Sequence, residues 1–273
     1  MSSIGKDIRL SRFLDSNRRG LMIPFDHGLP LGPIPGLLNV RDILEKILEG
    51  NPDGVLLTPG QARACKELLF GKNSPSLLLR LDWTTMFKEI GTEGYATIGT
   101  VKDAIKFGAD GVVVYLFDGY HDIRTQVSNV KNVAKIARQC EDLGIPLIVE
   151  AMARGDLAKG RELDPKVMSI PIRMAAEIGA DIIKADYTGQ ESSFREVVKS
   201  CPVPIMIAGG PKMTTESDVL QSVRDALNAG AAGVFFGRNV FQAQNPVLMV
   251  RALRHLIHEN GTVSKALQIL QQK

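Results

Sequence analysis

Residues 165–189 read PKVMSIPIRMAAEIGADIIKADYTG, and this stretch contains the unit that decides the fold. Its first part, residues 165–178, has the amphipathic pattern of a helix. Gly179 follows at the position where a glycine ends a helix without steric cost. The apolar run over residues 181–184 is typical of a short buried strand, and it ends in Lys184. Gly144 and Gly230 precede two other apolar runs in the same way, so one helix-to-strand connection is used repeatedly.

Apolar runs of this length occur eight times along the chain. They cover residues 20–25, 53–58, 76–81, 110–116, 146–150, 181–184, 203–208 and 232–236. Amphipathic segments separate them, at residues 40–49, 101–107, 127–143, 165–178, 191–200 and 216–229, and another closes the chain at residues 246–270. Most runs are continuous, as expected of parallel strands that are covered on both faces. Eight strand–helix units in 273 residues predict a single-domain α/β protein with the (β/α)8 TIM-barrel fold, for which about 250 residues is typical.

An open, doubly wound sheet is the main alternative for this pattern. That fold would carry a Gly-rich dinucleotide turn after the first strand, but residues 24–28 read PFDHG. The Pro- and Gly-rich residues 29–36 are interpreted as a long βα loop on the catalytic face. No linker divides the chain. We therefore expect one domain over residues 1–273, with an N-terminal lead-in at residues 1–19 and C-terminal helices at residues 246–272.

The composition argues against several classes of function. The formal net charge is +3, and basic residues are interspersed with acidic ones, so we expect no nucleic-acid partner. No apolar run approaches membrane-spanning length, so we expect no membrane partner and a cytoplasmic location. Cys65, Cys140 and Cys201 are far apart, and the four histidines form no HExxH-like cluster. Reduced thiols, no bound metal and no cofactor are therefore expected.

Lys184 is the strongest candidate for catalysis. Burial at the end of an apolar strand disfavours the ammonium form of a lysine. A neutral amine is a nucleophile that forms a Schiff base with a carbonyl compound. The alternative is a structural lysine whose ammonium reaches solvent beyond the end of the strand.

In a TIM barrel the carboxyl ends of the strands meet at one face, where the active site forms. Candidate residues at these ends are Asp26 and His27 (first strand), Arg80 and Asp82 (third), Tyr115 (fourth), Glu150 and Arg154 (fifth), Lys184 (sixth), Gly209 and Gly210 (seventh), and Gly237 and Arg238 (eighth). The last two pairs predict a phosphate site, because glycines let backbone N–H groups approach an anion and Arg238 adds a guanidinium. A tight turn is the alternative for Gly209 and Gly210.

The roles of the other polar residues stay open. Asp26 suits proton transfer near a buried lysine, and the alternative is a turn-forming or helix-capping aspartate. His27 is interpreted as a structural or positioning residue rather than a catalytic one. Glu150 and Arg154 are either substrate contacts or an ion pair that braces the strand ends.

Four motifs together resemble those of the archaeal-type class I aldolases in the DeoC/LacD superfamily. They are PFDHG at residues 24–28, IK-x-x-YTG at residues 183–189, IAGGPK at residues 207–212 and GRNVFQ at residues 237–242. The resemblance covers nearly the whole chain and implies a TIM barrel in a large homo-oligomer, such as a decamer of stacked pentamers. It implies that Lys184 is the Schiff-base lysine and Asp26 the acid/base residue. The resemblance also implies that Gly209, Gly210, Gly237 and Arg238 hold the substrate phosphate. From their places near the strand ends, we expect His27, Glu150, Arg154 and Tyr187 to complete the substrate site.

One position departs from that pattern. Aldolases of this group carry a proton-transferring tyrosine after the fifth strand, in a Tyr-Pro-Arg-Gly pattern, but residues 151–155 here read AMARG. Met152 stands in the place of the tyrosine and cannot transfer a proton. Ala185 and Asp186 also differ from the usual lysine motif. Glu150, Asp186, Tyr187, His27 or water could fill the missing role.

The resemblance implies a Schiff-base aldolase that cleaves or forms a C–C bond in a phosphorylated sugar or ketose. Fructose 1,6-bisphosphate is the first substrate to consider. Three alternatives remain open: a transaldolase-type aminodeoxyheptulosonate synthase, an acyl transfer like that of the related phospho-autoinducer-2 thiolase, and a sugar-phosphate binder without catalysis.

Overall fold

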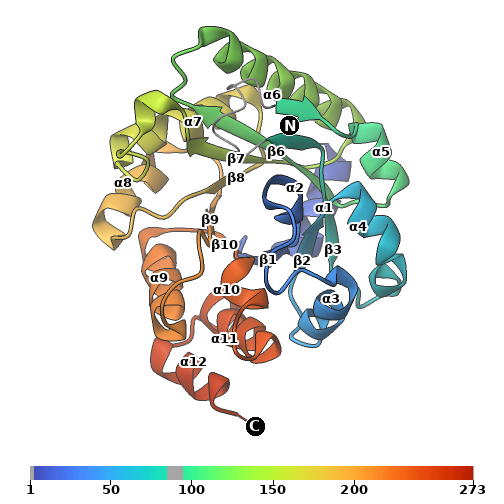
Figure 1. Cartoon of the computed structure of the whole chain (residues 1–273), viewed down its shortest axis with the longest axis vertical. Helices are drawn as coiled ribbons and strands as arrows, with labels where there is room; N and C mark the ends of the chain where they lie inside the picture. The colour runs from blue at the N-terminus through green and yellow to red at the C-terminus, as the bar shows by residue number, and fades with distance from the viewer. Residues whose placement is uncertain (1–2, 85–94, 273) are drawn as a thin grey trace.

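The computed structural model describes residues 3–84 and 95–272, and its centre is a closed barrel of eight parallel strands (Figure 1). Their order around the barrel is β1-β10-β9-β8-β7-β6-β3-β2. The strands are β1 (Gly20–Pro24), β2 (Gly54–Leu57), β3 (Ser76–Arg80), β6 (Gly111–Asp118), β7 (Leu147–Ala153), β8 (Ile182–Ala185), β9 (Ile205–Ala208) and β10 (Gly233–Phe235). Each overlaps one of the eight predicted runs, which confirms the TIM-barrel fold.

Helices surround the barrel (Figure 1); those from α3 to α9 lie between its successive strands, and α11 and α12 follow the last strand. They are α3 (Val40–Leu48), α4 (Pro59–Ala64), α5 (Val101–Lys106), α6 (Ile123–Leu143), α7 (Pro165–Ile178), α8 (Glu191–Ser200), α9 (Glu216–Ala229), α11 (Pro246–His258) and α12 (Val263–Leu270). Gly179 ends α7 with a φ of 114°, a left-handed conformation that favours glycine. Short helical turns complete the chain: α2 (Gly28–Leu31) lies at the start of the predicted loop, α10 (Arg238–Phe241) follows β10, and two 3-10 turns span Lys66–Leu69 and Asp156–Ala158.

The strand residues divide between two apolar cores because successive side chains point to opposite faces of a strand. Ile183 and its counterparts on other strands face the helices and form the larger core. Ile182 and its counterparts fill the barrel interior. Lys184 shares a face with Ile182, one step closer to the carboxyl end of β8. The lysine therefore points into the barrel above the apolar layer.

Different elements lie at the two ends of the barrel. At the amino ends of the strands, helix α1 (Ile4–Phe13) places Phe13 against the interior core. Beyond the carboxyl end of β3, the strands β4 (Asp82–Thr84) and β5 (Tyr95–Thr97) form an antiparallel pair. The indole N–H of Trp83 donates to the carbonyl of Leu29, which ties β4 to α2. The site can therefore form only at the carboxyl ends of the strands.

Several element boundaries differ from the sequence predictions, and two of these differences bear on the site or on the course of the chain. Strand β7 continues to Ala153 instead of ending at Glu150, because it pairs with β6 as far as Asp118. Met152 is therefore part of a barrel strand. The terminal amphipathic segment is two helices, since α11 ends at His258 and α12 begins at Val263.

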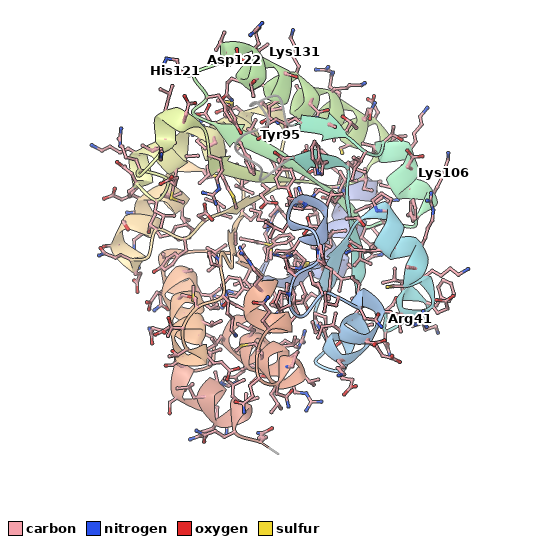
Figure 2. All side chains as sticks on the ribbon, viewed as in Figure 1. Arg41, Tyr95, Lys106, His121, Asp122 and Lys131 are labelled. Atoms are coloured by element: carbon pink, nitrogen blue, oxygen red, sulfur yellow. The ribbon has the colours of Figure 1, made fainter. Side chains whose placement is uncertain are left out.

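Lys106 on α5 and Lys131 on α6 project outward at the rim of the view, whereas Tyr95 on β5 lies nearer the middle (Figure 2). Within residues 3–84 and 95–272, no helix combines the length and the apolar composition needed to cross a bilayer.

Candidate active site

A cavity of about 150 Å³ opens at the carboxyl ends of the barrel strands. Of the ten residues predicted to act in catalysis or substrate binding, nine line it: Asp26, His27, Glu150, Arg154, Lys184, Gly209, Gly210, Gly237 and Arg238. The remaining lining residues are Pro24, Pro30, Leu31, Thr84, Tyr115, Phe117, Met152, Asp186, Ala208 and Phe235. One cavity thus gathers side chains from strands far apart in the sequence, as the barrel topology predicts.

Tyr187 is the tenth of these predicted residues, and it does not line the cavity. Its ring packs edge-on against Phe194 of α8, with ring centroids 5.2 Å apart. Burial raises the pKa of its hydroxyl to about 12. The turn after β8 therefore directs Tyr187 toward the helical layer, contrary to the predicted substrate contact.

Lys184 lines the cavity and is only 6% exposed. Its Nζ atom is 2.9 Å from Oε2 of Glu150, the residue beside it in the β7–β8 register. The ammonium also lies 5.7 Å from the centre of the Phe235 ring. Lys184 therefore does not reach bulk solvent, and its partner in the resting site is a carboxylate.

Arg80, which the sequence places at the end of the third strand without indicating a role, is a central residue of the site. It is fully buried at the end of β3, and its Nε donates to Oδ2 of Asp26 at 2.8 Å. Its Nη2 donates to Oε2 of Glu150 at 2.5 Å, the same oxygen that contacts Lys184. The guanidinium also stacks over Tyr115, with Cζ 3.9 Å from the ring centre. Arg80 therefore holds both candidate acid/base carboxylates through hydrogen bonds from one guanidinium group.

The charges of this cluster determine the ionisation of its acids. Burial raises the pKa of Asp26 and of Glu150, but Arg80 and Lys184 outweigh this effect and hold both pKa values below their ordinary range. Asp82 accepts more weakly from Arg80, at 3.5 Å, and burial raises its pKa to about 7. Near neutral pH Asp26 and Glu150 are therefore ionised carboxylates, which have the free oxygen lone pairs that a proton acceptor needs.

The loops after β9 and β10 form the second part of the cavity. Asn239 joins them, since its Nδ2 donates to the Gly209 carbonyl at 2.7 Å and its Oδ1 accepts from the Met213 amide at 2.8 Å. Arg238 faces the cavity with a buried Nε that lacks a hydrogen-bond partner among the described residues. Burial alone lowers the pKa of its guanidinium. An unpaired guanidinium beside glycine-rich turns is suited to bind an anion such as phosphate.

His27 lies between these two parts of the cavity. Its ring occupies the space beside Gly237, where any Cβ would be 2.3 Å from the imidazole, so only glycine fits there. Phe241 packs edge-on against the same ring. Burial lowers the His27 pKa to about 4, and Nδ1 lies 3.9 Å from Asp26. His27 is therefore a neutral imidazole near pH 7.

The third part of the cavity lies next to Lys184 and is lined by Met152, Arg154 and Asp186. Nη2 of Arg154 is 2.5 Å from Oδ2 of Asp186 and 3.2 Å from the sulfur of Met152. Burial raises the pKa of Asp186, although Arg154 opposes this effect. Within residues 3–84 and 95–272, no three His, Cys, Asp or Glu side chains gather in an arrangement that could hold a metal ion.

Comparison with known proteins identifies the family of this chain. The family model of the DeoC/LacD family aldolases matches residues 21–243. The chain belongs to the DeoC/LacD aldolase family. It is 40% identical over 273 residues to an uncharacterized aldolase of Saccharolobus solfataricus, a match that covers 98% of this chain and 99% of that one. It is also 34% identical to the 2-amino-3,7-dideoxy-D-threo-hept-6-ulosonate synthase of Halobacterium salinarum, with 98% and 97% covered.

Solved structures of family members have the same fold. An archaeal fructose 1,6-bisphosphate aldolase is 28% identical and superimposes with a TM-score of 0.83, covering 93% of this chain and 99% of the other. A second structure of such an archaeal aldolase, also 28% identical with a TM-score of 0.82, holds its catalytic lysine bound covalently to the carbinolamine intermediate. It covers 92% of this chain and 99% of its own. This chain therefore has the fold of Schiff-base-forming aldolases.

Proposed function

We propose that this DeoC/LacD aldolase forms a Schiff base between Lys184 and a phosphorylated ketose and cleaves or forms the neighbouring C–C bond. One observation carries the proposal: a buried lysine contacts a carboxylate in a cavity that also contains an unpaired arginine. The lysine supplies the nucleophile, and Arg238 with the loops after β9 and β10 supplies a phosphate site. Binding energy from the phosphate positions the carbonyl carbon beside the amine.

Imine formation begins with the loss of one proton from the Lys184 ammonium. Glu150 accepts this proton, because its Oε2 is 2.9 Å from Nζ. The neutral amine adds to the ketone carbon, and the resulting carbinolamine takes up a proton at its hydroxyl and loses water. The product is a protonated iminium, which is an electron sink. Glu150 can return the proton that the departing water requires.

Bond cleavage then needs a base for the hydroxyl of the departing aldehyde. Asp26 is the proposed base, since Arg80 and Lys184 keep it ionised and it faces the cavity. As the hydroxyl proton transfers to Asp26, the C–C bond breaks and its electron pair moves into the iminium to give an enamine. Protonation of the enamine carbon and hydrolysis of the imine release the second product and restore Lys184.

Arg80 acts on this sequence as a positioning residue. It donates from Nε to Asp26 at 2.8 Å and from Nη2 to Glu150 at 2.5 Å, so it holds the two proposed bases at the edge of one rigid guanidinium group. The guanidinium plane rests on Tyr115, which limits its rotation. Both carboxylates are thereby fixed before the substrate enters.

Two reactions of this class compete as the physiological one. Cleavage of fructose 1,6-bisphosphate is the activity named for the archaeal structures. Synthesis of an amino-sugar acid is named for the relatives from Halobacterium salinarum and Streptomyces griseus, 34% and 31% identical. The second reaction is favoured by Met152, which replaces the tyrosine expected of fructose-bisphosphate aldolases. It is also favoured by the Arg154–Asp186 pair, whose opposite charges complement an amino acid.

Deuterium exchange tests the proposed class of reaction. The enamine takes its proton from solvent, so the protein should introduce deuterium from D2O into dihydroxyacetone phosphate at the carbon beside the carbonyl. Lys184→Met should abolish the exchange. A sugar-phosphate binder would show no exchange in the wild type. Exchange that requires coenzyme A would favour acyl transfer instead.

A further inference from the structure

We infer that the site takes a ketose with a single phosphate, because Asp186 neutralises the arginine that a second phosphate would need. This inference rests on the proposed function and names its substrate class. Arg154 lines the cavity, and its Nη2 is 2.5 Å from Oδ2 of Asp186. An ion pair of this length uses the charge and the hydrogen-bonding edge with which a guanidinium would hold phosphate.

The barrel order places the two cavity arginines on opposite sides of Lys184. Arg238 follows β10, Lys184 is on β8 and Arg154 follows β7, and the order around the barrel is β10-β9-β8-β7. A ketose with its phosphate at Arg238 and its carbonyl carbon at Lys184 extends its distal carbons toward Arg154. The distal end of the substrate therefore meets the Arg154–Asp186 pair.

The charges at the two ends differ. Among the described residues that line the cavity, Arg238 is the cation without a carboxylate partner, while Lys184 pairs with Glu150 and Arg154 with Asp186. A phosphate dianion at the distal end would displace Asp186 from Arg154 and leave a carboxylate facing like charge. Hydroxyl groups, or a group that carries both an ammonium and a carboxylate, fit the pair without breaking its charge balance.

The chain also shows how the pair is held. Met152 is 6% exposed in β7, and its sulfur lies 3.2 Å from Nη2 of Arg154. Asp186 follows β8 directly and is 9% exposed. Both members of the pair are thus supported by neighbouring barrel strands, and the specificity for one phosphate is part of the scaffold.

Two ketoses that differ by one phosphate test the inference. Calorimetry should show that the wild type binds fructose 1,6-bisphosphate no more tightly than fructose 1-phosphate. Asp186→Asn frees Arg154 with little change in shape and should shift this ratio toward the bisphosphate by about tenfold to a hundredfold. Adding Arg154→Ala to Asp186→Asn should return the ratio to the wild-type value.

A matched control separates this effect from a general loss of an ion pair. Asp164 pairs with Arg161 at 3.2 Å and caps α7, outside the residues that line the cavity. Asp164→Asn keeps the capping oxygen and should leave the ratio unchanged. A wild type that already prefers the bisphosphate tenfold, or an Asp186→Asn variant with an unaltered ratio, would overturn the inference.

Calorimetry reports binding whether or not an imine forms, so the two proposals can fail separately. If the two ketoses bind with the predicted ratio but the protein catalyses no deuterium exchange, only the Schiff-base chemistry is contradicted. Deuterium exchange with a wild-type preference for the bisphosphate would contradict the single-phosphate inference alone. Failure of both ketoses to bind would also contradict the single-phosphate inference, since the Arg238 end would then hold no phosphate.

Discussion

The carboxylate of Glu150 lies 2.9 Å from the ammonium of Lys184, and both side chains are buried. The same carboxylate oxygen accepts from Arg80, so the lysine and the arginine share one acceptor. In the absence of substrate, the carboxylate balances the charge of the Lys184 ammonium, and it is also placed to accept its proton. Glu150 therefore occupies a position from which it can take the proton-transfer role that Met152 cannot fill.

Glu150→Gln should slow imine formation about 10²- to 10⁴-fold, which is the typical contribution of general acid–base catalysis. Glutamine keeps the shape of the side chain but cannot accept the proton from Lys184. The measurement is the single-turnover rate at which a ketose phosphate becomes trappable by borohydride. Phosphate binding at Arg238 should persist in this variant. An unchanged rate would show that another group accepts the proton.

Arg238→Ala should weaken the binding of dihydroxyacetone phosphate by roughly 1.5–3 kcal/mol, which is the value of a hydrogen bond to a charged group. Dihydroxyacetone lacks the phosphate and should be affected little. The comparison requires the concentration of each compound that gives half-maximal trapping. Arg238→Lys keeps the charge without the planar donor edge and serves as the control. Equal weakening of both compounds would mean that Arg238 only supports the fold.

Met152→Tyr should not increase the cleavage of fructose 1,6-bisphosphate. The proton-transfer role is already assigned to Glu150 and Asp26, and the added ring would enter a packed position beside Arg154. Met152→Phe controls for the size of that ring. A gain of tenfold or more with tyrosine but not with phenylalanine would show that the wild type lacks a proton-transfer group.

His258 makes a pH-dependent contribution to stability at the other end of the barrel. Its ring nitrogens lie 2.9 Å from Asp15 and 2.7 Å from Asp53. Burial lowers the His258 pKa, but the two carboxylates outweigh it and raise the pKa above the ordinary 6.5. A raised pKa in the folded state stabilises the protein fully below pH 6.5, and this stabilisation is lost as the pH rises through the folded-state value.

His258→Gln should therefore reduce the free energy of unfolding by about 1–3 kcal/mol at about pH 6 and by less at about pH 9. Urea denaturation of both proteins across this range measures the difference. The cavity is distant from His258, so the activity of the folded variant should be retained. A difference that stays constant over the pH range would show that the titration of His258 contributes nothing.

The barrel and most of its site could be predicted from local sequence patterns. The Gly179 connection and the run that ends in Lys184 indicate a helix followed by a strand, and alternation places Lys184 on the same face as Ile182. Because parallel strands end at one face, residues at other strand ends, such as Asp26 and Arg238, could be placed near Lys184. These predictions depend only on the topology of the barrel and not on any distance between side chains.

Other features depend on contacts between distant segments. Arg80 meets Asp26 and Glu150, which are 54 and 70 residues away along the chain, so no local pattern shows that it joins them. The three-residue strands β4 and β5 are too short for alternation to identify. Tyr187 follows a turn whose backbone directs its ring to α8, and a motif does not specify that direction.

The most direct measurement is the mass and position of a borohydride-reduced adduct. Wild-type protein reduced in the presence of dihydroxyacetone phosphate or fructose 1-phosphate should gain one ligand, and peptide mapping should place it on Lys184. Lys184→Met should gain none. An unmodified wild type, or an adduct that remains on another lysine in the Lys184→Met variant, would contradict the assignment of Lys184 as the Schiff-base residue.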